Sequence, residues 1–273
     1  MKIILDKSAL VAASPQILRN FTGSDYFVLI PTLRYEIATG TTATLTKCER
    51  TLPSLTGMWL AELDTLIRWE VEQGRSAQDA PTVWNTPNLL SNEFFELDEK
   101  AVEAYEAAWA RLGAIKGAPE DEEPVRRLQT MRKPEFYKFL ERKQGTLPLA
   151  RSARLSWSRE AKAQGFRVSR RFKPAPDWLC YGLQLVSETS LYWKFWRYGD
   201  SPAGQKKPAN FGLDIPYVAF LSIADVKSSR DGLLSADKAL LDFTSACWPQ
   251  KRSGLFLCES HPPRIEPHKF PGG

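Results

Sequence analysis

Four carboxylates occupy positions at which a sheet of parallel strands would gather them. Each follows a short apolar segment that predicts a strand, or opens an apolar helix. They are Asp6, Glu36, Asp214 and Asp237. Because active sites of parallel sheets lie at the C-terminal ends of the strands, we expect the four side chains to meet at one end of the sheet. Taken singly, each acid is also explained as a turn residue or a helix cap.

Clustered carboxylates predict a site for a hard divalent cation. Magnesium is usually bound by one or two carboxylates together with water and substrate phosphate. Several acids in close contact cannot all stay ionised without a cation. A bound Mg²⁺ or Mn²⁺ can activate water for in-line attack on phosphorus and stabilise the leaving oxygen. The residue types therefore favour metal-dependent phosphodiester hydrolysis.

The composition disfavours most rival chemistries. The two histidines, His261 and His268, both lie in a Pro-rich C-terminal segment, which disfavours mechanisms that need a firmly held histidine base. The four cysteines form no CxxC pair, so they indicate reduced thiols in a cytosolic protein and not a zinc site. Neither GxGxxG nor GxxxxGK[ST] is present where a nucleotide fold would need it. A haloacid-dehalogenase pattern would require an acid where Ser8 stands.

Positive charge is concentrated in one part of the chain. The net charge is +5, the pI is about 9.0, and segment 142–173 is strongly basic, whereas segment 93–123 is acidic. Aromatic residues Trp157, Phe166 and Phe172 lie within the basic segment, so we expect phosphate contacts with base stacking. A solvated basic face, or pairing with the acidic segment, is the alternative. The expected nucleic-acid contacts are Lys7, Arg151, Arg154, Arg159, Arg167, Arg170, Arg171 and Lys173.

The elements that would position the acids alternate between strand and helix. Continuous apolar runs predict buried strands at 2–5, 26–30 and 232–235. We expect a helix after each, with Thr32 capping the second, and apolar helices over 57–73 and 215–226. The strongly aromatic helix 178–199 is expected in the core. The other expected segments are a helix over 8–20 with a bend or break near Pro15, a linker over 201–212 and a short helix over 238–244.

These elements predict an α/β fold in which a parallel sheet flanked by helices is interrupted by a mostly helical insertion. The α/β core would comprise residues 1–45 and 210–256, and the insertion 46–209. Residues 257–273 are expected to form a flexible Pro-rich tail. No apolar run is long enough to span a membrane, and the N-terminal apolar run is interrupted by charge, so we expect a cytoplasmic protein.

Four short motifs together resemble the PIN-domain nuclease family. Their residues are ILDKSALVA, IPTLRYEI, LDIPYVAFLSIA and LLSADKALL, in the order and local structure of that family. The resemblance covers roughly residues 1–46 and 210–249 and leaves the middle unexplained. Lys7 departs from it, because the family usually has a small polar residue there, and a lysine could compete with metal or contact phosphate. Asp225 is an alternative to Asp214 on the same expected helix.

The resemblance implies cleavage of a phosphodiester, most often in RNA, leaving a 3′-hydroxyl and a 5′-phosphate. We expect Asp6, Asp214 and Asp237 to hold the metal and Glu36 to orient water. Ser8 and Ser235 would support these acids by hydrogen bonds. The expected protein is an endoribonuclease, with a toxin or defence effector as one role, a homodimer by resemblance and an inhibitory protein partner left open. The alternative is a non-catalytic nucleic-acid-binding or protein-interaction module on a degenerate PIN fold.

Overall fold

The computed structural model describes most of both ends of the chain and much of its middle. The described residues are 2–14, 18, 26–52, 58–61, 63–80, 84–85, 97–100, 102–103, 106–107, 127–198, 208–224, 232–260 and 263–267. The expected alternative acid Asp225, and most of the acidic segment 93–123, lie outside them.

The described strands form one mixed sheet in the order β4-β3-β2-β1-β5-β6-β7. The five inner strands run parallel, and an antiparallel strand borders them on each edge. The parallel strands are β1 (Lys2–Leu5), β2 (Tyr26–Leu29), β3 (Met58–Ala61), β5 (Gly232–Ser235) and β6 (Leu255–Ser260). The edge strands are β4 (Trp84–Asn85) and β7 (Pro263–Pro267).

The strand order reverses at β1. From β1 the chain moves outward to β2 and β3, whereas β5 and β6 are added on the opposite side of β1. Residue Ile3 is accordingly paired with Phe27 on one side and with Gly232 on the other. Such a switch point leaves a crevice at the C-terminal ends of the two strands, where ligands bind in open α/β sheets.

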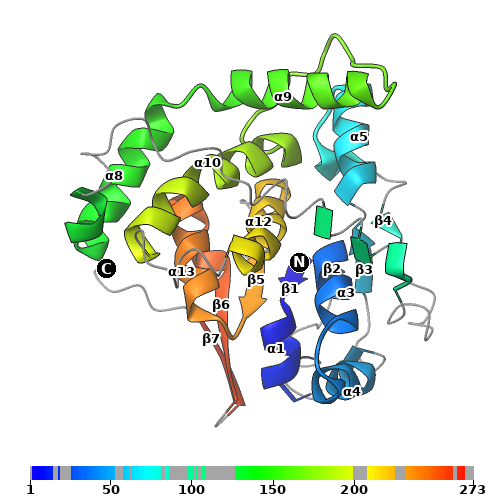
Figure 1. Cartoon of the computed structure of the whole chain (residues 1–273), viewed down its shortest axis with the longest axis vertical. Helices are drawn as coiled ribbons and strands as arrows, with labels where there is room; N and C mark the ends of the chain where they lie inside the picture. Colours follow the sequence, from blue (N-terminus) through cyan, green and yellow to red (C-terminus); the bar gives the residue numbers. More distant parts are fainter. Residues whose placement is uncertain are drawn as a thin grey trace.

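Helices surround this sheet, as Figure 1 shows. The long α10 and α12 lie centrally, while α9 and α1 lie at different ends of the long axis (Figure 1). The helices are α1 (Lys7–Ala12), α3 (Pro31–Ala38), α4 (Thr42–Thr51), α5 (Leu63–Gln73), α8 (Lys133–Thr146), α9 (Leu149–Ala163), α10 (Leu179–Tyr198), α12 (Pro208–Phe220) and α13 (Lys238–Cys247). None of those described combines the length and the apolar character that crossing a bilayer requires.

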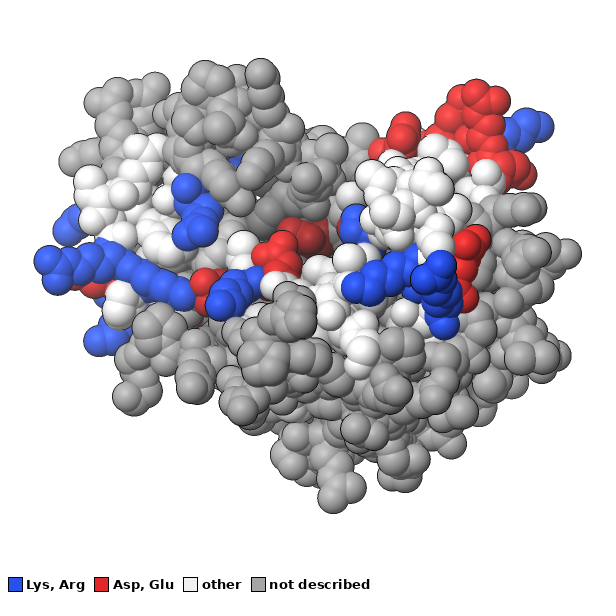
Figure 2. Space-filling view, turned by 90° about the horizontal axis from the view of Figure 1, so that it is seen from below, with Lys and Arg blue, Asp and Glu red and all other residues white. Residues whose placement is uncertain are grey.

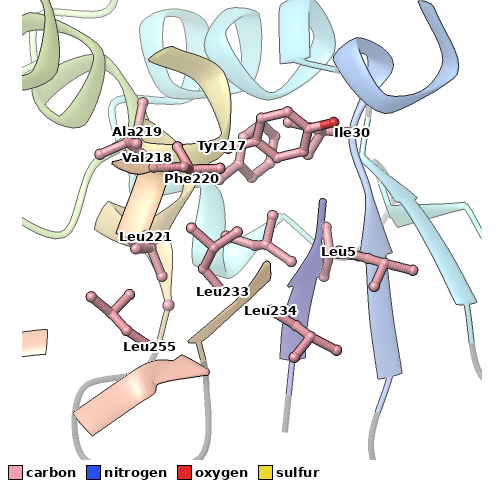
Figure 3. Packing of buried hydrophobic residues seen from close by; sticks show 14 of the residues in the cluster. Leu5, Ile30, Tyr217, Val218, Ala219, Phe220, Leu221, Leu233, Leu234 and Leu255 are labelled. Carbon is pink, nitrogen blue, oxygen red and sulfur yellow. The ribbon is translucent and has the colours of Figure 1, made fainter. Parts of the chain in front are cut away.

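The core lies between the central strands and the helices α10, α12 and α13. Leu5, Leu233 and Leu234 are fully buried. Leu233 and Leu234 point to opposite faces of β5, and Figure 3 shows Leu234 on the side of the sheet away from the Tyr217–Phe220 part of α12. Burial of each such side chain stabilises the fold by about 1.5–3 kcal/mol. Trp193 of α10 is also buried, so the aromatic helix belongs to the core, as expected.

The elements around the acids largely agree with the expectations. The strands predicted at 2–5, 26–30 and 232–235 are β1, β2 and β5, and α13 follows β5. Thr32 does not cap α3, because the cap position is Ile30 and Pro31 opens the helix. The helix expected over 8–20 with a bend or break near Pro15 is interrupted before that proline, since α1 stops at Ala12 and Leu18 is helical again.

Three segments differ more strongly. The helix expected over 57–73 is a strand, β3, followed by α5, so the mostly helical segment 46–209 also contributes to the sheet. Part of the tail expected to be flexible forms β7 and pairs with β6. The expected linker 201–212 overlaps α12, which begins at Pro208. Proline is favoured at a helix start because its missing N–H is not needed there.

Candidate active site at the end of the sheet

Two of the predicted acids are brought together by strand register. Asp6 directly follows β1, and Asp237 follows the neighbouring β5. Leu5 is paired with Leu234, and the Asp6 amide donates to the carbonyl of Leu234 at 3.1 Å. Backbone hydrogen bonding therefore continues past the last residue of β1 and holds the segments after β1 and β5 side by side at the switch point.

A small hydrogen-bond network fixes the Asp6 carboxylate. Its Oδ2 atom accepts from the Ser235 hydroxyl at 2.7 Å, from the Ser8 hydroxyl and from the Ser8 amide at 3.3 Å. The Ala236 amide donates to Ser8 Oγ at 2.8 Å. Ser8 and Ser235 thus support Asp6, as expected, because their two hydroxyls fix the orientation of its carboxylate. They also provide hydrogen bonds to a side chain that is almost fully buried.

Asp237 caps α13 and is exposed. Its Oδ1 atom accepts from the amides of Ala239 at 2.7 Å and Leu240 at 3.2 Å. The Asp237 amide donates to Ser235 Oγ at 2.9 Å, which ties this residue to the Asp6 network. The second carboxylate oxygen, Oδ2, takes no hydrogen bond from the described residues. A helix cap explains one oxygen of Asp237 and leaves the other available to a ligand.

Glu36 lies between a lysine and a tyrosine. Its Oε1 atom is 3.2 Å from Lys7 Nζ, and its Oε2 atom accepts from the Tyr217 hydroxyl at 2.7 Å. The Glu36 side chain is 14% exposed, whereas Lys7 is 34% exposed. Tyr217 was not among the expected site residues. Its signal in the sequence is its position three residues after Asp214, one turn along the same helix.

Asp214 lies within α12 and not at its start. The helix begins six residues earlier, so the helix-cap explanation of this acid does not apply. Its side chain has no hydrogen-bond partner among the described residues. The middle of α12 thus supplies an unpaired carboxylate to the same end of the sheet.

Contacts at the far end of α12 hold this helix in place. The Trp248 indole donates to the carbonyl of Val218 at 2.8 Å. Downstream, the buried ammonium of Lys251 donates to the carbonyl of Ala224 at 3.1 Å. Lysine near a helix C-terminus satisfies carbonyls that lack helical partners and interacts favourably with the helix dipole. These contacts anchor the helix that carries Asp214 and Tyr217.

The acids repel one another strongly enough to affect their ionisation. Burial raises the pKa of Asp6, which the two serines oppose and Asp237 reinforces. Burial and then the charge of Asp6 raise the pKa of Glu36, while Lys7 and Tyr217 lower it. The pKa of Asp214 lies well above its usual value because of desolvation and then repulsion from Asp6, Glu36 and Asp237. The four predicted acids therefore form one electrostatic unit, the acid cluster.

The acid cluster fits a divalent cation in donor type and in charge. Carboxylate oxygens are the ligands that Mg²⁺ prefers, and a cation would relieve the mutual repulsion. Among the described residues, however, no three His, Cys, Asp or Glu side chains are arranged as a ready-made metal-binding group. Instead, the Lys7 ammonium neutralises Glu36 directly. The arrangement can bind a cation only with small side-chain movements or with water and substrate as further ligands.

The basic segment lies elsewhere. Arg151, Arg154 and Arg159 are exposed on α9, which Figure 1 places far from α1, whose first residue is Lys7. Figure 2 shows acidic atoms in a hollow at the centre of one face, with Lys and Arg side chains on both sides. The other expected contacts of the basic segment lie after α9 and are exposed as well: Arg167, Arg170, Arg171 and Lys173.

Each aromatic residue of the basic segment has contacts within the protein. Phe172 is fully buried beside Trp178, with ring centroids 5.8 Å apart. The Trp157 indole donates to the carbonyl of Cys180, and the Phe166 ring is covered by the Arg68 guanidinium at 4.3 Å. These rings anchor the segment. The prediction of base stacking is wrong for the buried Phe172 and stays a prediction for the half-buried Trp157 and Phe166.

No family model matches this sequence, and comparison with curated proteins and with solved structures finds no match.

Proposed function

We propose that the protein is a metal-dependent phosphodiesterase, an endoribonuclease of PIN type. The observation that supports this most is the convergence of four acids from four separate segments at the switch point of a parallel sheet, with raised pKa values for Asp6, Glu36 and Asp214. The parallel sheet flanked by helices agrees with the resemblance of the four short motifs to PIN domains.

In this proposal Asp6, Asp214 and Asp237 hold Mg²⁺ or Mn²⁺. When bound, the cation supplies Lewis-acid activation of water and of the scissile phosphate. Glu36 orients the attacking water and accepts its proton, and Tyr217 holds Glu36 in position through the 2.7 Å hydrogen bond. Lys7 lies at the mouth of the acid cluster, where its ammonium can leave Glu36 and contact a substrate phosphate.

RNA is proposed as the substrate because basic side chains flank the acidic hollow (Figure 2). An anionic strand crossing the face drawn in Figure 2 would meet positive charge on both sides of its acidic hollow. Phosphate contacts of this kind position a strand without reading its sequence. A toxin or defence role, a cytoplasmic location, a homodimer and an inhibitory partner stay predictions.

Cleavage of labelled RNA and single-stranded DNA, with Mn²⁺, Mg²⁺ or EDTA, tests the proposal. We expect metal-dependent cutting by the wild type and none by the double variant Asp6→Asn, Asp237→Asn. The matched control Glu141→Gln removes one exposed carboxylate on α8 and should cut normally. Equal cutting by the double variant would show a contaminating nuclease or a different site.

A second candidate is a non-catalytic nucleic-acid-binding module on the same fold. The ion pair between Lys7 and Glu36 favours it, because a built-in ammonium can replace the cation that the acids require. In that case Lys7→Ala should weaken RNA binding in EDTA, and no metal should produce cleavage. For the nuclease, Lys7→Ala should still cleave and should need less Mn²⁺ for half-maximal activity, since the competing charge is gone. It should need more RNA for half-maximal activity, since a phosphate contact is lost.

A further inference from the structure

An open pocket of about 950 Å³ lies between the C-terminal end of α5 and the segment that follows α9. Arg167, Arg170 and Arg171 line it, together with Glu72 and Gln73. α5 and α9 lie side by side at one end of the long axis, and α1 lies at the other end (Figure 1). The proposed chemistry of the acid cluster does not use this pocket.

Two of these arginines occupy the centre of a tight turn. The amide of Phe172 donates to the carbonyl of Ser169 at 3.1 Å, which closes a β-turn with Arg170 and Arg171 at its central positions. The Arg171 amide also donates to Ser169 Oγ at 3.2 Å. Serine at the first turn position fixes the backbone in this way. The two arginines therefore extend from a defined backbone.

The turn is docked firmly on the end of α5. The Ser169 amide donates to the carbonyl of Val71 at 2.9 Å. Gly74 has φ +63°, and a Cβ atom there would lie 2.7 Å from Arg171 Cβ and 2.8 Å from Ser169 Oγ. Glycine is required both for this backbone conformation and for the close approach. Buried Phe172 anchors the other side of the turn.

The three guanidinium groups lack a carboxylate partner within the described part of the chain. The acid in the lining, Glu72, already pairs with Arg68 at 3.1 Å. No side-chain hydrogen bond or ion pair joins Arg167, Arg170 or Arg171 to another described residue. Three like charges around one pocket give it a positive potential that attracts an anion. The rigid turn keeps them there.

We propose that this pocket binds a phosphate group of a nucleic acid, either in its backbone or at its 5′ end. The planar guanidinium group makes paired hydrogen bonds to phosphate oxygens, and several such groups match the charge and the oxygens of phosphate. The identity of the carrier rests on the proposed function, whereas phosphate binding itself does not. The pocket would hold part of the strand at a distance from the acids and so help to select where cleavage occurs.

Binding without cleavage tests this assignment. The probe is a short single-stranded RNA labelled at its 3′ end, with either a 5′-phosphate or a 5′-hydroxyl, measured by fluorescence anisotropy in EDTA. The test variant is Arg170→Gln with Arg171→Gln. The matched control is Arg151→Gln with Arg154→Gln, which removes the same charge from the exposed face of α9. Inorganic phosphate and polyglutamate serve as competitors.

We expect the test variant to lose about tenfold or more in affinity, and the α9 control to lose markedly less. A loss confined to the 5′-phosphorylated RNA places the end of the strand in the pocket, and an equal loss for both RNAs places the backbone there. Equal losses in the test and control variants would overturn the assignment, because they indicate general electrostatic attraction. Displacement by polyglutamate as readily as by phosphate would also overturn it.

Gly74→Ala provides a variant that changes no charge. The added Cβ displaces the turn, so we expect weaker RNA binding in EDTA while Asp6 and its serines are unaffected. Unchanged affinity would overturn the requirement for a fixed turn. Inorganic phosphate should displace RNA from the wild type, or raise its melting temperature, and should do neither for the Arg170 and Arg171 variant. This result would support the pocket even if RNA cleavage is never observed. That result would separate failure of the proposed function from failure of this inference.

Discussion

Two regions of the molecule bury carboxylates, and they do so in different ways. Glu70 of α5 is fully buried and accepts three backbone hydrogen bonds, from Ala77 at 3.0 Å, Leu179 at 2.7 Å and Cys180 at 2.8 Å. Its carboxylate thereby joins α5 to the first residues of α10. At the acid cluster, in contrast, Asp6 is held by two serines and faces other acids.

The pKa values of both groups are raised, and the causes distinguish them. For Glu70 the pKa rises to about 7 through burial alone, and its hydrogen bonds oppose the rise. For Asp6, Glu36 and Asp214 burial acts together with repulsion from neighbouring carboxylates. A carboxylate whose oxygens are hydrogen-bonded and that has no acidic neighbours stabilises a helix junction. Carboxylates that repel one another favour the binding of a cation, because the cation removes the repulsion. Stability and activity should therefore respond oppositely to changes in the two regions.

The largest expected effect is on activity, at Asp6. Asp6→Asn should lower metal-dependent cleavage by about a thousandfold, since it removes a cation ligand that supplies several kcal/mol in the transition state. Asparagine still caps α1 and carries no buried charge, so the free energy of unfolding should be unchanged or higher. RNA cleavage rates and urea denaturation measure the two quantities. Strong destabilisation would place Asp6 in the same structural class as Glu70.

Glu70→Ala should show the reverse pattern. It leaves three buried amides without an acceptor, so the free energy of unfolding should fall by about 3 kcal/mol. Folded Glu70→Ala should retain cleavage, because Glu70 does not belong to the acid cluster. Urea denaturation and cleavage at a low temperature, at which the variant is folded, test this. A specific loss of activity in well-folded protein would show that the α5–α10 junction contributes to catalysis.

The pH dependence of stability should also identify Glu70. Its folded pKa is about 7, against a usual value of 4.5, so the folded state binds more protons between these values and stability falls as pH rises through this window. Between about pH 5 and about pH 8 the wild type should lose roughly 2 kcal/mol that Glu70→Gln does not lose. Urea denaturation of both proteins at each pH gives the difference. Identical slopes would show that Glu70 keeps an ordinary pKa.

The smallest of these effects is expected at Ser235. Ser235→Ala removes the 2.7 Å hydrogen bond to Asp6 and the acceptor for the Asp237 amide. Removing such supporting groups typically costs about 10- to 100-fold in metal affinity or activity. We expect a higher Mn²⁺ requirement in the cleavage assay. Unchanged metal dependence would limit Ser235 to a structural role.

The sequence was informative where a single signal decided the structure. Continuous apolar runs ended by Asp6 or Pro31 predicted β1 and β2, and four acids after predicted elements indicated one end of the sheet. Residues 57–73 were ambiguous, because a four-residue apolar run before a helical pattern extends the apparent helix. Pro263 and Pro267 suggested a flexible tail, yet proline is tolerated on an edge strand such as β7.

Tertiary packing decided the features that the sequence did not reveal. Whether Phe172 faces solvent or the core depends on the docking of its turn against α5, which local spacing does not encode. Glu70 offers no sequence signal, since two of its three donors, Leu179 and Cys180, lie 109 and 110 residues away. Lys7 could be recognised as unusual, but its ion pair with Glu36 depends on the fold.

The pairing of β1 with β5 has a consequence for the timing of synthesis. Asp6 is synthesised 229 residues before its partner Ser235, and Asp237 follows two residues later. At about 5–20 residues per second, this interval lasts on the order of tens of seconds. Throughout this interval the nascent chain lacks β5, so the central strand β1 has no partner on that side. The acid cluster is thus completed only after the 229 residues from Asp6 to Ser235 have been synthesised.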